Sequence, residues 1–407
     1  MAGLADLVEQ KARHRNIWVL TAGQALGGAN APIVIALGGL VGQHLAAAPA
    51  LITLPASLMN LGLALGTLPA AYGMRRFGRK PAYLFGACVG VLAGLIAALG
   101  IIQASFAIFC FGTGLAGFYA AYVQSYRFAA ADSETGAASQ KAIARVMVGG
   151  LAAAILGPQI VIWTKGAVPG TPFAGSFLAQ AVVAACAIPV LLTLRLPPAI
   201  KEHDHRHAGG RPLAEILLTP RYLLAIATGV VSYGLMTFVM TASPIAMVSH
   251  GHSIDDAAMG IQWHVLAMFG PSFFTGRLMV RFGKERVAAI GICLIAASAI
   301  VALNGTDIAH FWIALVLLGC GWNFGFIGAT AMVAQCHTPS ERNKVQGAND
   351  FLVFGTVAAA SFFSGALLRS AGWQMINWVV LPAVVLVLVP LVWRAARPWP
   401  QAEAEFN

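Results

Sequence analysis

The chain has 407 residues, of which 58% are hydrophobic and only 10% are charged. Soluble domains carry about one quarter charged residues, so this composition excludes a soluble globular protein and indicates one that is built into a membrane. The net charge of +10 fits basic residues concentrated in cytoplasmic loops, and we expect no nucleic-acid partner. The six cysteines are scattered through apolar segments without a CxxC motif, so no disulfide framework is expected.

Twelve apolar segments are each long enough to cross about 30 Å of hydrocarbon as a helix. A long polar interruption divides them into six and six. We therefore predict an all-α membrane protein with twelve transmembrane helices in two six-helix pseudo-repeats. Its parts are an N-terminal half (1–196), a central cytoplasmic loop (197–220) and a C-terminal half (221–407). The predicted spans are 16–42, 48–74, 81–103, 105–131, 141–167, 173–196, 222–248, 257–279, 287–304, 308–335, 346–370 and 373–394.

Lysine and arginine are distributed unequally between the two sides of the predicted bundle. If the N-terminus is inside, the outer connections contain only Lys165 and Arg369, and the inner loops hold many basic residues. This asymmetry predicts that both termini are cytoplasmic. We expect a multi-pass protein of the bacterial inner membrane, a monomer in contact with lipid.

A short basic motif occurs twice. MRRFGRK (74–80) follows the second segment and MVRFGKE (279–285) follows the eighth, which puts Gly78 and Gly283 about half a chain apart. Two six-helix halves with these repeated loops resemble the major facilitator superfamily, over essentially the whole chain. The resemblance implies solute transport by alternating access, with the two halves rocking around a site near the midplane.

Several amide side chains fall inside the predicted membrane segments. Such residues usually face the interior of a bundle, and hydrogen bonding between helices is the expected role for most of them. Asn323 is also a candidate for coupling or gating. The amides are Gln24, Asn30, Asn60, Gln124, Gln159, Gln180, Gln262 and Asn323.

One acidic residue, Asp350, lies well within a predicted membrane segment, near the start of the eleventh. A carboxylate there could carry protons, so Asp350 is a second candidate for coupling or gating. It could equally cap the helix near the inner interface and pair with Lys344 or Arg145. We favour the structural role.

Two pentads on consecutive segments combine methionine and histidine. MTFVM (236–240) and HVLAM (264–268) each place two soft metal ligands at i and i+4, on one face of a helix. Counted from the polar break between the segments, Met240 and His264 lie at one depth, and Met236 and Met268 at another. The pattern predicts a four-residue metal site in the outer-to-middle part of the bilayer. Ordinary packing by methionine is the alternative.

Thioether and imidazole ligands favour Cu(I), and neutral ligands can release the ion during transport. At these residues the sequence resembles the CcoA-type bacterial copper importers, which carry MxxxM in helix 7 and HxxxM in helix 8. The resemblance implies secondary-active copper import that supplies the assembly of a cbb3-type cytochrome c oxidase. Copper would be the cargo, with no permanently bound cofactor and with a copper chaperone as a cytoplasmic partner. Related branches without the motifs include riboflavin importers, so import of a small organic solute is the second hypothesis.

Other histidines lie at the two ends of the path that the ion would take. His250 and His252 are in the predicted outer break, and His203, His205 and His207 are in the central cytoplasmic loop. His-rich tracts can bind metals, so these residues are candidates for taking up and releasing the ion. Solvated loops without a metal are the alternative.

Two other classes of protein are not supported by the sequence. We find no nucleotide-binding loop, nucleophile triad or carboxylate pair, so the protein is not expected to be an enzyme. A membrane sensor would need a signalling domain, and no polar segment is long enough to form one.

Overall fold

The computed structural model describes residues 2–132, 137–195, 211–338 and 341–396. In these ranges every regular element is a helix, as predicted. The N-terminal half contains α1 (Ala2–Gly28), α2 (Asn30–Leu45), the 3₁₀ helix η1 (Pro49–Leu51), α3 (Leu54–Phe77), α4 (Arg79–Ile102), α5 (Phe106–Gln124), α6 (Tyr126–Ala131), α7 (Ala137–Thr164) and α8 (Ala174–Leu192). The C-terminal half contains α9 (Leu213–Leu217), α10 (Pro220–Ser249), α11 (Ile254–Phe269), α12 (Ser272–Phe282), α13 (Lys284–Leu303), α14 (Ile308–Val333) and α15 (Arg342–Ala396).

The number of membrane crossings follows from these bounds. Within the described residues, ten helical stretches are long and apolar enough to span a membrane. The last of them covers two crossings, because Gly372 interrupts α15 with a φ of 78°. A further crossing consists of α11 and α12, each too short alone and separated at Gly270 and Pro271. The prediction of twelve membrane helices is confirmed.

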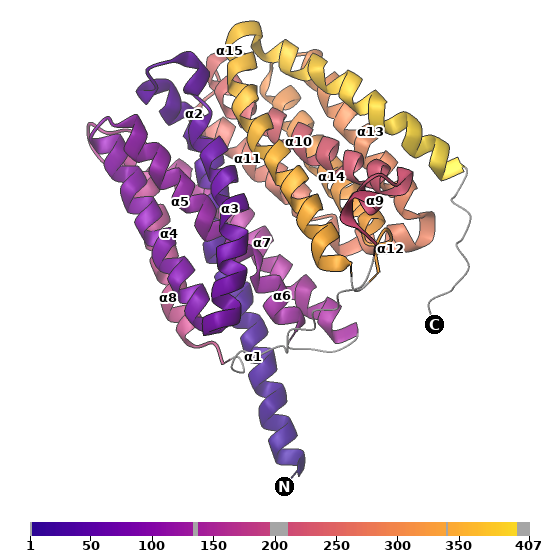
Figure 1. The fold of residues 1–407 in the computed structure, drawn as a ribbon. Coiled ribbons are helices and arrows are strands. Elements are labelled where there is room, and N and C mark those ends of the chain that lie inside the picture. Colours follow the sequence, from indigo (N-terminus) through magenta and orange to yellow (C-terminus); the bar gives the residue numbers. More distant parts are fainter. Residues whose placement is uncertain (1, 133–136, 196–210, 339–340, 397–407) are drawn as a thin grey trace.

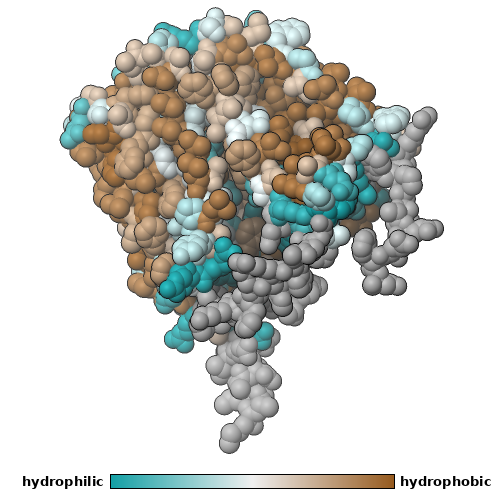
Figure 2. Space-filling view, in the orientation of Figure 1, coloured by the Kyte–Doolittle hydropathy of each residue, from teal (hydrophilic) through white to brown (hydrophobic). Residues whose placement is uncertain are grey.

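The helices form two bundles side by side (Figure 1). The N-terminal half, coloured indigo to pink, occupies one side of the molecule, and the C-terminal half, coloured red to yellow, occupies the other. Hydrophobic residues cover most of the face in Figure 2, and hydrophilic residues collect toward its two ends. Large apolar side chains such as Leu68, Trp163 and Leu386 are exposed on the outside of the bundles, as expected for surfaces in contact with lipid.

The repeated basic motif has the same backbone conformation in both halves. Gly78 has φ 90° and ψ 161°, and Gly283 has φ 89° and ψ 154°. Each ends one helix and begins the next, at the junctions α3–α4 and α12–α13. A side chain is disfavoured at such a positive φ, so glycine is the residue that allows this tight reversal.

Three membrane crossings are interrupted near their middle or inner part. The breaks lie between α1 and α2 at Ala29, between α5 and α6 at Ser125, and between α11 and α12 at Gly270 and Pro271. Proline has no backbone N–H and its ring clashes with the preceding turn, which explains the third break. These interruptions were not predicted. All three lie beside the cavity described below.

The two halves touch through paired helices, namely α7 with α11, α2 with α10 and α3 with α15. At the predicted outer end, Lys165 forms an ion pair with Asp255 across the boundary. Thr53 Oγ1 also donates a hydrogen bond of 3.2 Å to the Phe362 carbonyl there. Contacts between the halves therefore close the predicted outer end of the molecule above the cavity.

Candidate functional site

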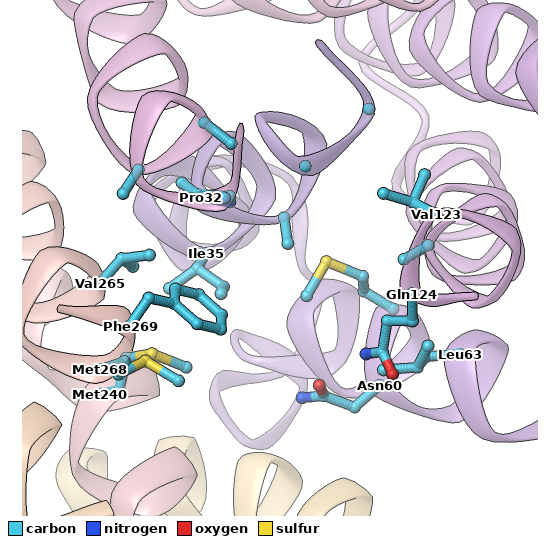
Figure 3. A pocket seen from close by; sticks show the side chains of 18 of the residues that line it. Pro32, Ile35, Asn60, Leu63, Val123, Gln124, Met240, Val265, Met268 and Phe269 are labelled. Atoms are coloured by element: carbon cyan, nitrogen blue, oxygen red, sulfur yellow. The ribbon is translucent and has the colours of Figure 1, made fainter. Parts of the chain in front are cut away.

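A cavity lies between the two halves, next to the interrupted helices (Figure 3). The volume open to the centres of water molecules is about 160 Å³. The cavity is lined by Gln24, Gly27, Gly28, Ala31, Pro32, Ile35, Met59, Asn60, Leu63, Ala120, Val123, Gln124, Gly150, Ala153, Ala154, Tyr233, Met236, Thr237, Met240, Val265, Met268 and Phe269. Residues of both halves contribute, as in a site that opens alternately to the two sides of a membrane.

The two sides of the cavity differ in chemistry. Asn60 and Gln124 bring their amide groups together on the N-terminal side, whereas Met240, Met268 and Phe269 form an apolar wall on the opposite side (Figure 3). Among the described residues that line the cavity there is no Lys, Arg, Asp or Glu. An ion would lose its hydration here without gaining a charged partner, so the cavity suits an uncharged, partly polar molecule.

Aromatic side chains extend the apolar wall behind Tyr233. The Tyr233 ring centroid lies 5.3 Å from that of Trp322 and 4.9 Å from that of Phe326. Trp322 and Phe326 stack at 5.5 Å, and Phe269 contacts Trp322 at 6.1 Å. These distances are typical of favourable aromatic pairs. Of this cluster, Tyr233 and Phe269 line the cavity, and Trp322 and Phe326 pack behind them.

Five of the eight amides have protein partners. Gln159 Nε2 donates to Gln262 Oε1 at 3.0 Å, across the boundary between the halves. Gln180 Nε2 donates to Asn30 Oδ1 at 2.6 Å, and Asn30 Nδ2 donates to a backbone carbonyl of α5 at 2.9 Å. The fifth, Asn323, is described below. For these five, the expected role in interhelical hydrogen bonding is confirmed.

The other three amides, Gln24, Asn60 and Gln124, all line the cavity. None of them has a side-chain hydrogen-bond partner among the residues that the structure describes. They come from α1, α3 and α5 and therefore converge from three helices of the N-terminal half. All three are half-buried, so their amide groups are accessible from the cavity and available to a ligand.

The predicted metal cluster is only partly assembled. Met236, Met240 and Met268 line the cavity, as their helical spacing suggested. His264 does not, because its Nδ1 lies 2.7 Å from the Leu315 carbonyl of α14 and the ring is fully buried. The histidine thus joins α11 to α14, and the methionines form part of the cavity wall.

Asn323 secures the break between α11 and α12. Its Nδ2 donates at 2.6 Å both to the Met268 carbonyl and to Ser272 Oγ, and its Oδ1 accepts from Thr275 Oγ1 at 2.6 Å. These bonds satisfy polar groups on both sides of the interruption that Pro271 creates. Asn323 therefore fixes the position of the cavity wall that contains Met268.

Asp350 is exposed and accepts a hydrogen bond of 3.2 Å from Asn349 Nδ2. The expected pairing with Lys344 is not formed, because Lys344 Nζ donates to the Arg211 carbonyl instead. A coupling role for Asp350 stays a prediction.

The outer histidines have structural contacts. His250 Nδ1 lies 2.8 Å from the Ala246 carbonyl, and His252 Nε2 lies 2.7 Å from the Thr306 carbonyl. Both rings also pack against Phe311, with centroids 6.0 and 5.6 Å away. The other candidates for ion release, His203, His205 and His207, lie outside the described residues.

Known proteins resemble the chain to different degrees. It is 64% identical over 398 residues to the riboflavin transporter RfnT of Brucella anthropi. The aligned region covers 98% of this chain and 100% of that protein. It is 28% identical to the uncharacterised MFS-type transporter YddS of Bacillus subtilis, over 93% of this chain and 90% of that protein. A crystal structure of a variant of the nucleoside transporter NupG superposes with a TM-score of 0.71 at 12% identity, over 92% of this chain and 99% of that one. The last likeness concerns the fold alone.

The prediction of copper as cargo is wrong. A relative that shares 64% of its residues over nearly the whole chain is named for riboflavin, and this finding outweighs four residues in two pentads. The geometry agrees, since His264 is bonded to a carbonyl away from the cavity. The predicted supply of copper to a cbb3-type oxidase and the copper chaperone as partner are withdrawn with it. The histidines proposed for copper uptake and release lose that role as well.

The family itself is established by the sequence. The model of the Major Facilitator Superfamily matches residues 17–353 and 228–406. The prediction of a transporter rather than an enzyme is confirmed. The chain belongs to the major facilitator superfamily and is a multi-pass membrane transporter.

Proposed function

We propose that this protein imports riboflavin across the cell membrane by alternating access, with the central cavity as the substrate site. The observation that carries the proposal is the 64% identity to a riboflavin transporter over the whole length of both chains. At this similarity, the residues that line a central cavity are expected to be shared to a large extent. Riboflavin was the second hypothesis from the sequence, and it now takes first place.

The chemistry of the cavity supports this cargo. Riboflavin is uncharged at neutral pH, and the described lining contains no ionised side chain. Its flat three-ring isoalloxazine system suits a wall of aromatic and thioether groups such as Tyr233, Phe269 and Met268. Its polar ring edge and its ribityl hydroxyls need hydrogen-bond partners. The unpaired amides of Gln24, Asn60 and Gln124, which line the cavity, can supply them.

The arrangement of the halves supports alternating access. The Lys165–Asp255 ion pair and the Gln159–Gln262 hydrogen bond join α7 to α11 on the predicted outer side of the cavity. These contacts hold the halves together at that end. Outward opening requires both of them to break, and the same contacts re-form when the outer end closes over the cargo, before the cargo is released inward.

The proposal is tested by riboflavin uptake in bacteria that neither make riboflavin nor possess another riboflavin transporter. Cells that produce this protein should grow on low riboflavin and accumulate labelled riboflavin, and cells with an empty vector should do neither. Copper chelation in the medium should leave the initial rate of uptake unchanged. If the protein reaches the membrane in normal amounts and uptake stays at the vector level, the proposal is wrong.

A further inference from the structure

We propose that the unpaired amides of Gln24, Asn60 and Gln124 recognise the pyrimidine edge of the flavin ring. The opposite, dimethylbenzene end of the ring then rests against the methionine and aromatic wall of the C-terminal half. The inference rests on the proposed transport of riboflavin and assigns the orientation of that substrate. It makes the three amides the residues that determine specificity.

The first step of the argument is the selection of these three amides. Five other membrane amides are paired with protein groups, and Gln24, Asn60 and Gln124 have no side-chain partner among the described residues. All three line the same cavity. Asn60 and Gln124 lie together on one side of it (Figure 3). Unpaired polar groups cost free energy unless a ligand or water satisfies them, so these amides form a ready recognition surface.

The second step is the match in hydrogen-bonding pattern. The pyrimidine edge of isoalloxazine presents a carbonyl oxygen, an N–H and a second carbonyl oxygen in a rigid row. An amide side chain offers two N–H donors and an acceptor oxygen, so it can meet both kinds of group. Three amides from α1, α3 and α5 can therefore satisfy the whole edge. A charged side chain would not discriminate in this way.

The third step is the match in polarity across the cavity. The isoalloxazine ring is polar at its pyrimidine end and apolar at its dimethylbenzene end. The cavity has amides on the N-terminal side and Met240, Met268 and Phe269 on the C-terminal side (Figure 3). The reverse orientation would place the ring edge, with its two carbonyls and an N–H, on the side where Tyr233 and Thr237 carry the polar groups among the described lining residues, and would bring the dimethylbenzene end against the amides. The ring therefore lies across the boundary between the halves.

The position of the ribityl chain follows. It leaves the ring from the central nitrogen on the long side, at right angles to the axis that joins the two ends. With the ring across the boundary, the chain extends along the cavity, where its flexible hydroxyls can keep contact with water. Recognition thus depends on the ring edge more than on the chain.

The inference is tested with purified protein in lipid nanodiscs, by competition against labelled riboflavin. Lumiflavin has a methyl group in place of ribityl and should compete with an affinity close to that of riboflavin. N3-methylriboflavin keeps the chain but loses the edge N–H, and it should bind about tenfold more weakly or worse, because a buried polar partner is left unpaired.

Two variants link this preference to the proposed residues. Asn60→Leu and Gln124→Met keep the size of the side chain and remove its polar groups. Loss of the amide that accepts the edge N–H should weaken riboflavin binding and leave binding of N3-methylriboflavin nearly unchanged, so in at least one of the two variants the ratio of the two affinities falls toward one. Gln374→Leu removes an exposed amide of α15 outside the cavity, and it should keep the parental ratio. If the two affinities shift together in both variants, neither amide accepts the edge N–H, and the assignment of that group to Asn60 or Gln124 is wrong.

The failure of this inference is distinguishable from that of the proposed function. If the parental protein binds riboflavin and N3-methylriboflavin equally well, the orientation is wrong and riboflavin transport stands. The comparison needs no variant, so it holds even if one substitution prevents folding. If the parental protein does not bind riboflavin at all, both proposals fail.

Discussion

Two regions between the halves contain amide side chains, which are paired with each other in one region and have no side-chain partner in the other. At the predicted outer end, the amides of Gln159 and Gln262 bond to each other, beside the ion pair of Lys165 with Asp255. In the central cavity, Asn60 and Gln124 lie without a side-chain partner among the described residues. Paired amides hold helices together, whereas unpaired ones are free to bind cargo. The partner of an amide, and not its presence in the membrane, indicates its role.

The largest effect on stability is expected at Asn323, the most heavily bonded amide. Asn323→Leu removes three hydrogen bonds of 2.6 Å and leaves buried polar groups of the α11–α12 break unpaired. Thr275 Oγ1 keeps its bond to the Pro271 carbonyl, so the Met268 carbonyl and Ser272 Oγ are the groups that lose their partner. We expect the free energy of unfolding to fall by about 2–6 kcal/mol, at ~1–3 kcal/mol for each of these two groups. Thermal unfolding of the purified protein measures the change. An unfolding temperature equal to that of the parent would show that the bonds do not secure the break.

A somewhat smaller loss is expected for the paired amides at the outer end. Gln159→Leu leaves the Gln262 amide unpaired and should cost about 1–3 kcal/mol of stability. Replacing both glutamines by leucine removes both polar groups and should recover most of the loss. The double variant is therefore the control. If it is less stable than either single variant, the two residues do not act as a pair.

A still smaller effect is expected for the methionines of the cavity wall. Met240→Leu and Met268→Leu keep volume and apolar character, so each should cost less than about 1.5 kcal/mol. Riboflavin uptake should persist in both variants, because the wall supplies contact surface and no ligated ion. Transport assays on the two single variants and on the double variant check this. Complete loss of uptake with normal folding would mean that sulfur has a specific role.

A pH-dependent effect is expected at the inner end of the C-terminal half. Arg211 donates to the buried Glu341 carboxylate from its side chain and its backbone, and this holds the pKa of Glu341 well below its usual range. A lowered pKa stabilises the fold above the ordinary value of about 4.3, and this stabilisation is lost as pH falls further. The difference in unfolding temperature between the parent and Glu341→Gln should be constant from pH 6 to 8 and shrink in acid. A difference that grows in acid would contradict the assignment.

Much of the fold could be predicted from the sequence. Segment lengths and apolar composition gave twelve crossings, and the repeated motif around Gly78 and Gly283 marked equivalent loops. Two further details of the fold have recognisable sequence signals that the predictions did not include. Pro271 indicates the break of the eighth crossing, and the spacing of Ser253 and Asp256 forms the capping box at the start of α11.

The candidate site was less predictable, because its character depends on contacts between distant segments. The pairing of Gln159 with Gln262 joins residues 103 positions apart, and nothing local distinguishes them from Asn60. His264 shares a helical face with Met268, but the close approach of α14 decides its partner. A Cβ at Gly319 would lie 2.5 Å from the His264 carbonyl, so glycine permits this approach. His264 therefore joins two helices whereas Met268 lines the cavity, a difference that their shared spacing did not reveal.

The central claim is that the cavity between the halves holds riboflavin, and a cavity-filling substitution tests it most directly. Gly150 lines the cavity, and an added Cβ there meets nothing within 4 Å, so Gly150→Leu should fill the space without disturbing the helices. Gly355→Leu is the matched control, because that glycine is equally open and does not line the cavity. Equilibrium binding of riboflavin to purified protein should be retained in the parent and in Gly355→Leu and lost in Gly150→Leu. Undiminished binding by a folded Gly150→Leu variant would contradict the account.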